Sequence, residues 1–129
     1  MDNLTWFETL NKPLFAPPNW VFTPVWTVLY ILMGIAFVIY LRGYERNKSV
    51  GVMYFFVQLI LNLLWPSVFF GNMDIKGGLI IVALLVIFVT LTVYEFYKKS
   101  KLSAVLLLPY LFWVLFATYL NYQYYVLNN

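Results

Sequence analysis

Four long stretches of the 129-residue sequence carry no charged side chain: residues 13–41, 49–73, 77–94 and 102–129. Each is long enough to cross a hydrocarbon core of roughly 30 Å as a helix, which takes about 20 residues. A membrane β-barrel would instead show short segments of alternating polarity. The sequence therefore predicts an all-α, polytopic bundle of membrane helices.

The composition agrees with this placement, since 64% of the residues are hydrophobic and 10% are charged. Soluble domains average about 25% charged residues. We expect one transmembrane domain over residues 1–129, with spans at about 21–41, 50–70, 78–97 and 102–125. Residues 1–20 form an N-terminal segment whose prolines interrupt regular helix.

The basic residues predict the orientation in the membrane. Six of the eight lie in two short loops: Arg42, Arg46 and Lys48 in the first, and Lys98, Lys99 and Lys101 in the second. An excess of Lys and Arg marks cytoplasmic loops. We therefore expect a bacterial cell membrane protein with its N-terminal segment and C-terminus outside. The positive net charge is then explained by the cytoplasmic loops, so we expect no nucleic-acid partner.

Several kinds of chemistry are excluded by what the spans lack. The sequence has no His and no Cys, so it offers no metal site, no strong haem ligand and no usual nucleophile–base pair. Asp74 and Glu95 fall at span ends, which argues against ion-coupled transport. A small multidrug exporter also has four spans but needs a carboxylate in the first. We expect no required cofactor, and binding is favoured over catalysis.

Polar and aromatic residues recur at helical spacing inside three spans. They are Trp26 and Tyr30 in the first, Gln58, Asn62 and Trp65 in the second, and Trp113, Phe116 and Ala117 in the fourth. Buried amides must form hydrogen bonds, either between helices or with a ligand. The pattern alone favours packing over a ligand pocket and leaves both open. Pro66, which disturbs the carbonyl of Asn62, is equally compatible with a simple kink and with a cavity.

Four ordered blocks resemble the tryptophan-rich sensory protein family, also called the translocator protein or peripheral benzodiazepine receptor family. The blocks are WFETLNKP at 6–13, PPNWVFTPVWTVLY at 17–30, QLILNLLWPSVFFG at 58–71, and PYLFW with FATYLNY at 109–113 and 116–122. The family pattern has five spans, and the helix that precedes the first block in that pattern is not among the four here.

The resemblance implies a homodimeric membrane protein that binds porphyrins in an intramembrane pocket. Carried over by position, the pocket is lined by Trp26, Tyr30, Asn62, Trp65, Trp113 and Ala117, and Gln58 and Phe116 share these faces. In bacterial relatives, residues that match Trp26 and Trp113 are linked to light-dependent breakdown of bound protoporphyrin. These two positions are therefore the photochemical candidates.

We accordingly expect a receptor or translocator that binds protoporphyrin IX, or haem, and that senses, sequesters or transports it in tetrapyrrole or oxidative stress. Lys12 is a candidate partner for a propionate. Recognition of cholesterol through the sterol motif is not expected, because that motif needs a basic residue after its tyrosine and none follows Tyr122. The alternatives are a light-dependent porphyrin-degrading enzyme, which would form a product under illumination, and a structural subunit of a membrane complex, which would co-purify with a partner.

Overall fold

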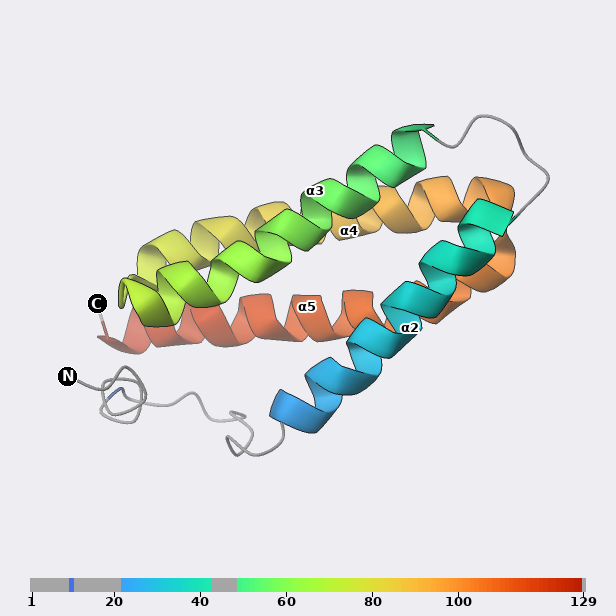
Figure 1. Cartoon of the computed structure of the whole chain (residues 1–129). Coiled ribbons are helices and arrows are strands. Elements are labelled where there is room, and N and C mark those ends of the chain that lie inside the picture. Colours follow the sequence, from blue (N-terminus) through green and yellow to red (C-terminus); the bar gives the residue numbers. More distant parts are fainter. Residues whose placement is uncertain (1–9, 11–21, 43–48, 129) are drawn as a thin grey trace.

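The computed structural model describes residue 10 and residues 22–42 and 49–128 of the chain (Figure 1). These ranges form helices α2 (Phe22–Arg42), α3 (Ser49–Pro66), α4 (Ile75–Lys99) and α5 (Lys101–Asn128), with a π-helical segment η2 (Ser67–Gly71) after α3. All four long helices have the length and hydropathy of membrane spans. The predicted all-α membrane bundle is confirmed, and each span lies within a few residues of its expected bounds.

Polar residues account for both ends of α4. The Asp74 carboxylate precedes the helix and accepts a hydrogen bond from the backbone N–H of Gly77 at 2.9 Å, as an N-cap does. Lys98 and Lys99 occupy the last turn, where positive charge is favourable next to the carboxyl end of the helix dipole. Ser100 then adopts an extended backbone with φ of −155°, so a single residue separates α4 from α5.

The chain changes its helical winding after Pro66. Proline has no N–H to donate to the carbonyl four residues before it, and the helix continues as η2. The N–H of Asn72 bonds to the carbonyl of Ser67 at 3.0 Å, which is the five-residue spacing of a π-turn. Pro66 therefore alters the winding near the end of the second span without ending the helix.

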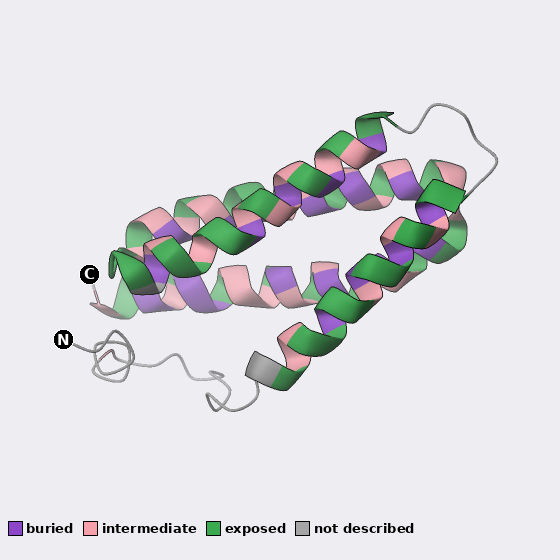
Figure 2. Cartoon of the chain, viewed as in Figure 1, coloured by how far each residue is buried: buried purple, intermediate pink, exposed green. Residues whose placement is uncertain are grey.

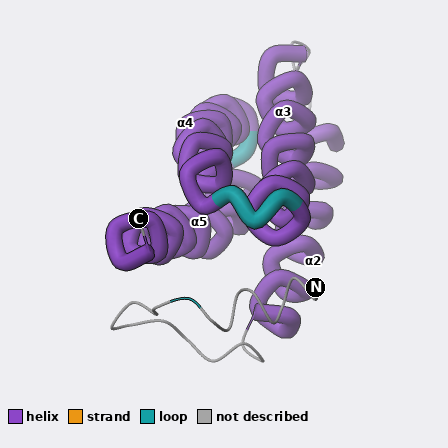
Figure 3. Tube along the Cα trace, turned by 90° about the vertical axis from the view of Figure 1, so that its left-hand side faces the viewer, coloured by secondary structure: helices purple, strands orange, loops and turns teal. Residues whose placement is uncertain are grey.

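The order of the helices brings the basic segments together. Helix α4 packs against both α3 and α5, while α2 packs against α5 and crosses it at an angle (Figures 1 and 3). The end of α2 and the junction of α4 with α5 lie at the same end of the bundle, opposite the C-terminus (Figure 1). Arg42 and residues 98–101 therefore share one end, as the loop charges predict.

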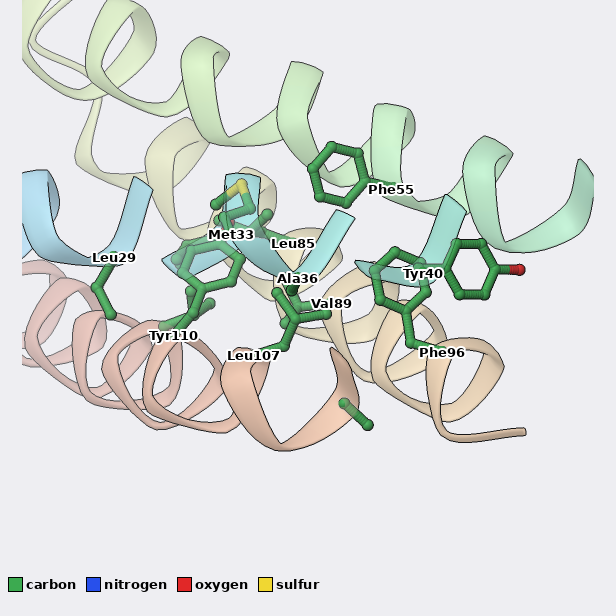
Figure 4. Close-up of a cluster of buried hydrophobic side chains, with 13 residues drawn as sticks. Leu29, Met33, Ala36, Tyr40, Phe55, Leu85, Val89, Phe96, Leu107 and Tyr110 are labelled. Carbon is green, nitrogen blue, oxygen red and sulfur yellow. The ribbon is translucent and has the colours of Figure 1, made fainter. Parts of the chain in front are cut away.

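Apolar side chains from all four helices form the core between them (Figure 4). The ring of Tyr40 on α2 stacks on Phe96 of α4 with 4.0 Å between centroids, and Phe37 stacks on Phe55 of α3 at 4.3 Å. A Cβ atom at Gly51 would lie 2.7 Å from Cζ of Tyr40. Glycine at this position lets the backbone of α3 approach the ring.

The outer surface of the bundle is apolar. Buried positions face inward and exposed positions face outward along the helices (Figure 2). Large apolar side chains are among the most exposed, with Phe112 at 65% and Leu63 at 59%. A soluble protein rarely exposes so much contiguous apolar surface, whereas lipid solvates it. The interior, in contrast, holds buried polar groups, namely Gln58, Asn62, Thr92, Ser103 and Asn121.

Candidate ligand site

Trp26 on α2 is the centre of an aromatic group between α2 and α5. Its ring lies 6.3 Å from that of Trp113 at an interplanar angle of 90°, and 6.4 Å from that of Tyr110 at 67°. Tyr30, one helical turn along α2, lies 5.8 Å away. Edge-to-face pairs of this kind are favourable because the positive edge of one ring meets the negative face of the other.

The group continues along α5 through Phe116. Its ring lies 5.6 Å from that of Trp113, and Ala117 packs against the core beside it. We call Trp26, Tyr30, Trp113, Phe116 and Ala117 the aromatic seam. None of the five is fully buried: Tyr30 is 39% exposed and the other four are half-buried. The seam is therefore accessible in part to a molecule dissolved in the membrane.

A chain of hydrogen bonds runs from the seam into the core. The hydroxyl of Tyr30 donates to Oδ1 of Asn62, and Nδ2 of Asn62 donates to the hydroxyl of Tyr110 at 2.7 Å. That hydroxyl donates in turn to Oε1 of Gln58 at 2.7 Å. Nε2 of Gln58 points to the sulfur of Met33 at 3.6 Å. These five residues, which we call the polar chain, join α2, α3 and α5.

The polar chain shows how the two predicted amides are satisfied. Gln58 and Asn62 are 1% and 4% exposed, and their partners lie on neighbouring helices. Interhelical bonding, one of the two interpretations of the sequence, is thus present, and Asn62 connects it to the seam through Tyr30. The sequence interpretation missed two members of the polar chain, Met33 and Tyr110, and Tyr110 is the one that bonds to both amides. The sequence signal that could have identified Tyr110 is its hydroxyl group within an apolar run, three residues before Trp113.

Trp65 belongs to a different environment from the other predicted site residues. Its Nε1 donates to Oδ1 of Asn121 at 2.8 Å, and Nδ2 of Asn121 donates to the carbonyl of Ile75 at 3.0 Å. The ring of Trp65 stacks on Phe69 at 5.0 Å, and Leu10 packs against the same cluster. Trp65 also touches the main core, so it connects the core to the end of the bundle that holds the C-terminus.

The structure therefore brings together seven of the eight predicted site residues. Five form the aromatic seam, and Gln58 and Asn62 lie behind it in the polar chain, whereas Trp65 bonds at the C-terminal end of the bundle. Lys12, the candidate for a propionate, lies outside the described residues. Among the residues that the structure describes, no group of three or more potential metal ligands occurs.

The fold and this arrangement define a multi-pass helical membrane protein whose interior is rich in aromatic and amide side chains. The chain belongs to the TspO/MBR family, whose model matches residues 1–127. It is 46% identical over 125 residues to the tryptophan-rich protein TspO of Chlorobaculum tepidum, which covers 95% of this chain and 79% of the relative. The protein of the same name from Archaeoglobus fulgidus is 47% identical over 125 residues, with 96% and 80% covered. The human translocator protein is 37% identical over 124 residues, with 94% and 73% covered.

Proposed function

We propose that this chain is a membrane receptor or translocator for tetrapyrroles and that it binds protoporphyrin IX against the aromatic seam. The observation that carries the proposal is the perpendicular pair of half-buried indoles, Trp26 and Trp113, on facing sides of α2 and α5. The choice of a porphyrin as the ligand rests on the family, because the resemblance described above implies porphyrin binding. The relatives' names, tryptophan-rich sensory protein and translocator protein, suit a sensing or transport role.

The chemistry of the seam suits a flat, amphipathic macrocycle. Aromatic rings provide a large contact area and favour offset-stacked or edge-to-face arrangements with another π-system. In the proposed complex the macrocycle lies against Trp26 and Trp113, and the hydroxyl of Tyr30 serves a polar edge. The charged propionates would remain near the membrane surface, where Lys12 is their proposed partner, because burying an unpaired carboxylate in lipid is costly.

Quenching of tryptophan fluorescence tests the proposed function. Protoporphyrin IX added to the purified protein in detergent should quench its five tryptophans in a saturable manner. Cholesterol should not compete with the porphyrin. Free tryptophan in the same micelles is the control for non-specific absorption. Quenching that rises linearly, as it does for the free amino acid, would contradict the proposal.

Haem should bind no more tightly than iron-free protoporphyrin. The chain has no His and no Cys, so only weak donors such as methionine or tyrosine are available to the iron. The absorption spectrum of the haem complex should lack the bands of a low-spin, bis-ligated iron. A low-spin spectrum, or a clear preference for haem over protoporphyrin in parallel titrations, would show that the iron is ligated and that this prediction is wrong.

We further propose that the basic end of the bundle faces the cytoplasm of a bacterial cell. Single cysteines test this orientation, because the chain has none of its own. Ser49→Cys and Ser100→Cys should be protected from an impermeant thiol reagent in intact cells and should react after permeabilisation, because both lie at the end shared by the basic segments. Asn128→Cys should react in intact cells. The reverse pattern would invert the orientation.

A further inference from the structure

The basic end of the bundle carries a second recognisable surface, remote from the aromatic seam. In the sequence, residues 42–48 and 95–101 hold six basic residues and two acidic ones, Glu45 and Glu95. The rest of the sequence holds two basic and three acidic residues. The positive charge is therefore concentrated in two short segments of the sequence, and the described parts of both, at the end of α2 and at the junction of α4 with α5, lie at one end of the bundle (Figure 1).

Two lysines at this end are held over tyrosine rings. The Nζ atom of Lys98 lies 5.2 Å from the ring centroid of Tyr94, and Nζ of Lys101 lies 5.9 Å from that of Tyr97. Both rings are more than half exposed, at 58% and 54%. A cation within about 6 Å of a ring face is attracted by the ring quadrupole. Tyr94, Tyr97 and Lys98 belong to the last turns of α4, and Lys101 begins α5.

The geometry places these pairs at the level of lipid headgroups. Helix α4 has 25 residues and so is about 37 Å long at 1.5 Å per residue, which exceeds a hydrocarbon core of roughly 30 Å. A helix of this length has residues beyond the acyl chains, and its last turn, which carries Lys98 and Lys99, is an end that hydrocarbon excludes because charge in the bilayer core is costly. Tyrosine rings prefer this interfacial layer, and lysine stems reach from it toward phosphate groups.

Among the residues that the structure describes at this end, Glu95 is the acidic group that could neutralise the lysines, and it does so only in part. Its carboxylate pairs with Lys98 at 3.2 Å, and the lysine side chain remains 45% exposed. An exposed pair of this kind contributes little free energy. Lys101 keeps its position over Tyr97 and is exposed. Arg42, at the end of α2, adds charge to the same face.

We propose that this end of the bundle binds the headgroups of anionic phospholipids, with Lys98 and Lys101 as the principal phosphate ligands and Tyr94 and Tyr97 as the rings that hold them in place. The partner is the lipid of the surrounding leaflet, because lysines at the end of a membrane span are expected at the level of the bilayer phosphates. The proposal is independent of the tetrapyrrole site, since no residue is shared.

Native mass spectrometry of the detergent-purified full chain tests the proposal by counting bound lipids. Dioleoyl-phosphatidylglycerol and dioleoyl-phosphatidylcholine are added in competition. The wild-type protein should retain the anionic lipid in preference. Each of Lys98→Gln and Lys101→Gln should lower the apparent affinity for phosphatidylglycerol by about fivefold, the factor for one basic residue near an anionic surface. Added salt should reduce the preference of the wild type by screening.

Matched variants distinguish a specific effect of Lys98 and Lys101 from the effect of removing any positive charge. Lys76→Gln, at the start of α4 and the opposite end of the bundle, should keep the full preference. Lys98→Arg with Lys101→Arg should also keep it, because both charges remain. The proposal is overturned if the wild type retains both lipids equally, if the two glutamine variants keep the preference, or if Lys76→Gln loses it to the same degree. Melting curves of each variant in detergent confirm that the fold is intact.

Discussion

Tyr110→Phe should destabilise the bundle by about 1–2 kcal/mol. The hydroxyl of Tyr110 accepts a hydrogen bond from Nδ2 of Asn62 and donates one to Oε1 of Gln58, so its removal takes the partner from one buried amide donor and one buried amide acceptor. An unsatisfied buried polar group costs about 1–3 kcal/mol. Measured hydrogen bonds between membrane helices average about 0.6 kcal/mol each, so the loss of two such bonds gives about 1 kcal/mol, the lower end of the expected range.

Unfolding of the purified protein by denaturant in micelles measures this effect. Tyr122→Phe is the matched control, because Tyr122 lies on the same helix and is 51% exposed, and it should change the free energy of unfolding little. Adding Gln58→Leu to Tyr110→Phe should cost less than the sum of the two single changes, since the partners act as a unit. Equal stability of Tyr110→Phe and Tyr122→Phe would show that the polar chain contributes nothing.

Trp113→Phe and Trp26→Phe should each weaken the binding of protoporphyrin IX by about 0.5–1.5 kcal/mol. This is the range for an aromatic pair beyond its buried area, and it corresponds to about two- to tenfold in affinity. Phenylalanine keeps much of the apolar volume, so the fold should survive the change. Any loss of bound porphyrin under illumination should also slow in both variants, because indole is more readily oxidised than benzene.

Trp20→Phe is the control for these two variants, because its place in the sequence, ahead of the first span, predicts a membrane-interface position. Affinity is measured by titration with the porphyrin, illuminated decay by absorbance, and integrity by thermal melting in detergent. Trp20→Phe should match the wild type in affinity. If Trp26→Phe and Trp113→Phe also match it in both affinity and decay, the aromatic seam is packing alone and the site lies elsewhere.

The spans were predictable because hydrocarbon excludes charge. A charge-free run of sufficient length has few alternatives in lipid, and the loops that interrupt these runs carry the lysines and arginines. The helical spacing of Gln58 and Asn62 also predicted two side chains that turn inward, and that of Trp26 and Tyr30 predicted two that share a face of the first span. These are local properties of one helix, and periodicity reports them directly.

The partners of the inward-facing residues were not predictable in the same way. Tyr110 resembles any other aromatic residue in an apolar run, and only the three-dimensional arrangement of the helices shows that its hydroxyl lies between two amides of α3. Trp65 shares a helical face with Asn62, yet its indole N–H bonds to Asn121, 56 residues later in the chain. Such pairings depend on how helices cross, and the sequence pattern of a single span does not contain that information.

The most direct test of the tetrapyrrole site is the nuclear magnetic resonance spectrum of the indole N–H groups. The chain has five tryptophans, and single Trp→Phe variants assign their signals. A bound porphyrin shifts nearby protons strongly through its ring current. We predict that protoporphyrin IX shifts the signals of Trp26 and Trp113 most, and that of Trp65 less, because Trp65 bonds outside the seam. Unchanged signals for Trp26 and Trp113 at saturating porphyrin would contradict the proposed site.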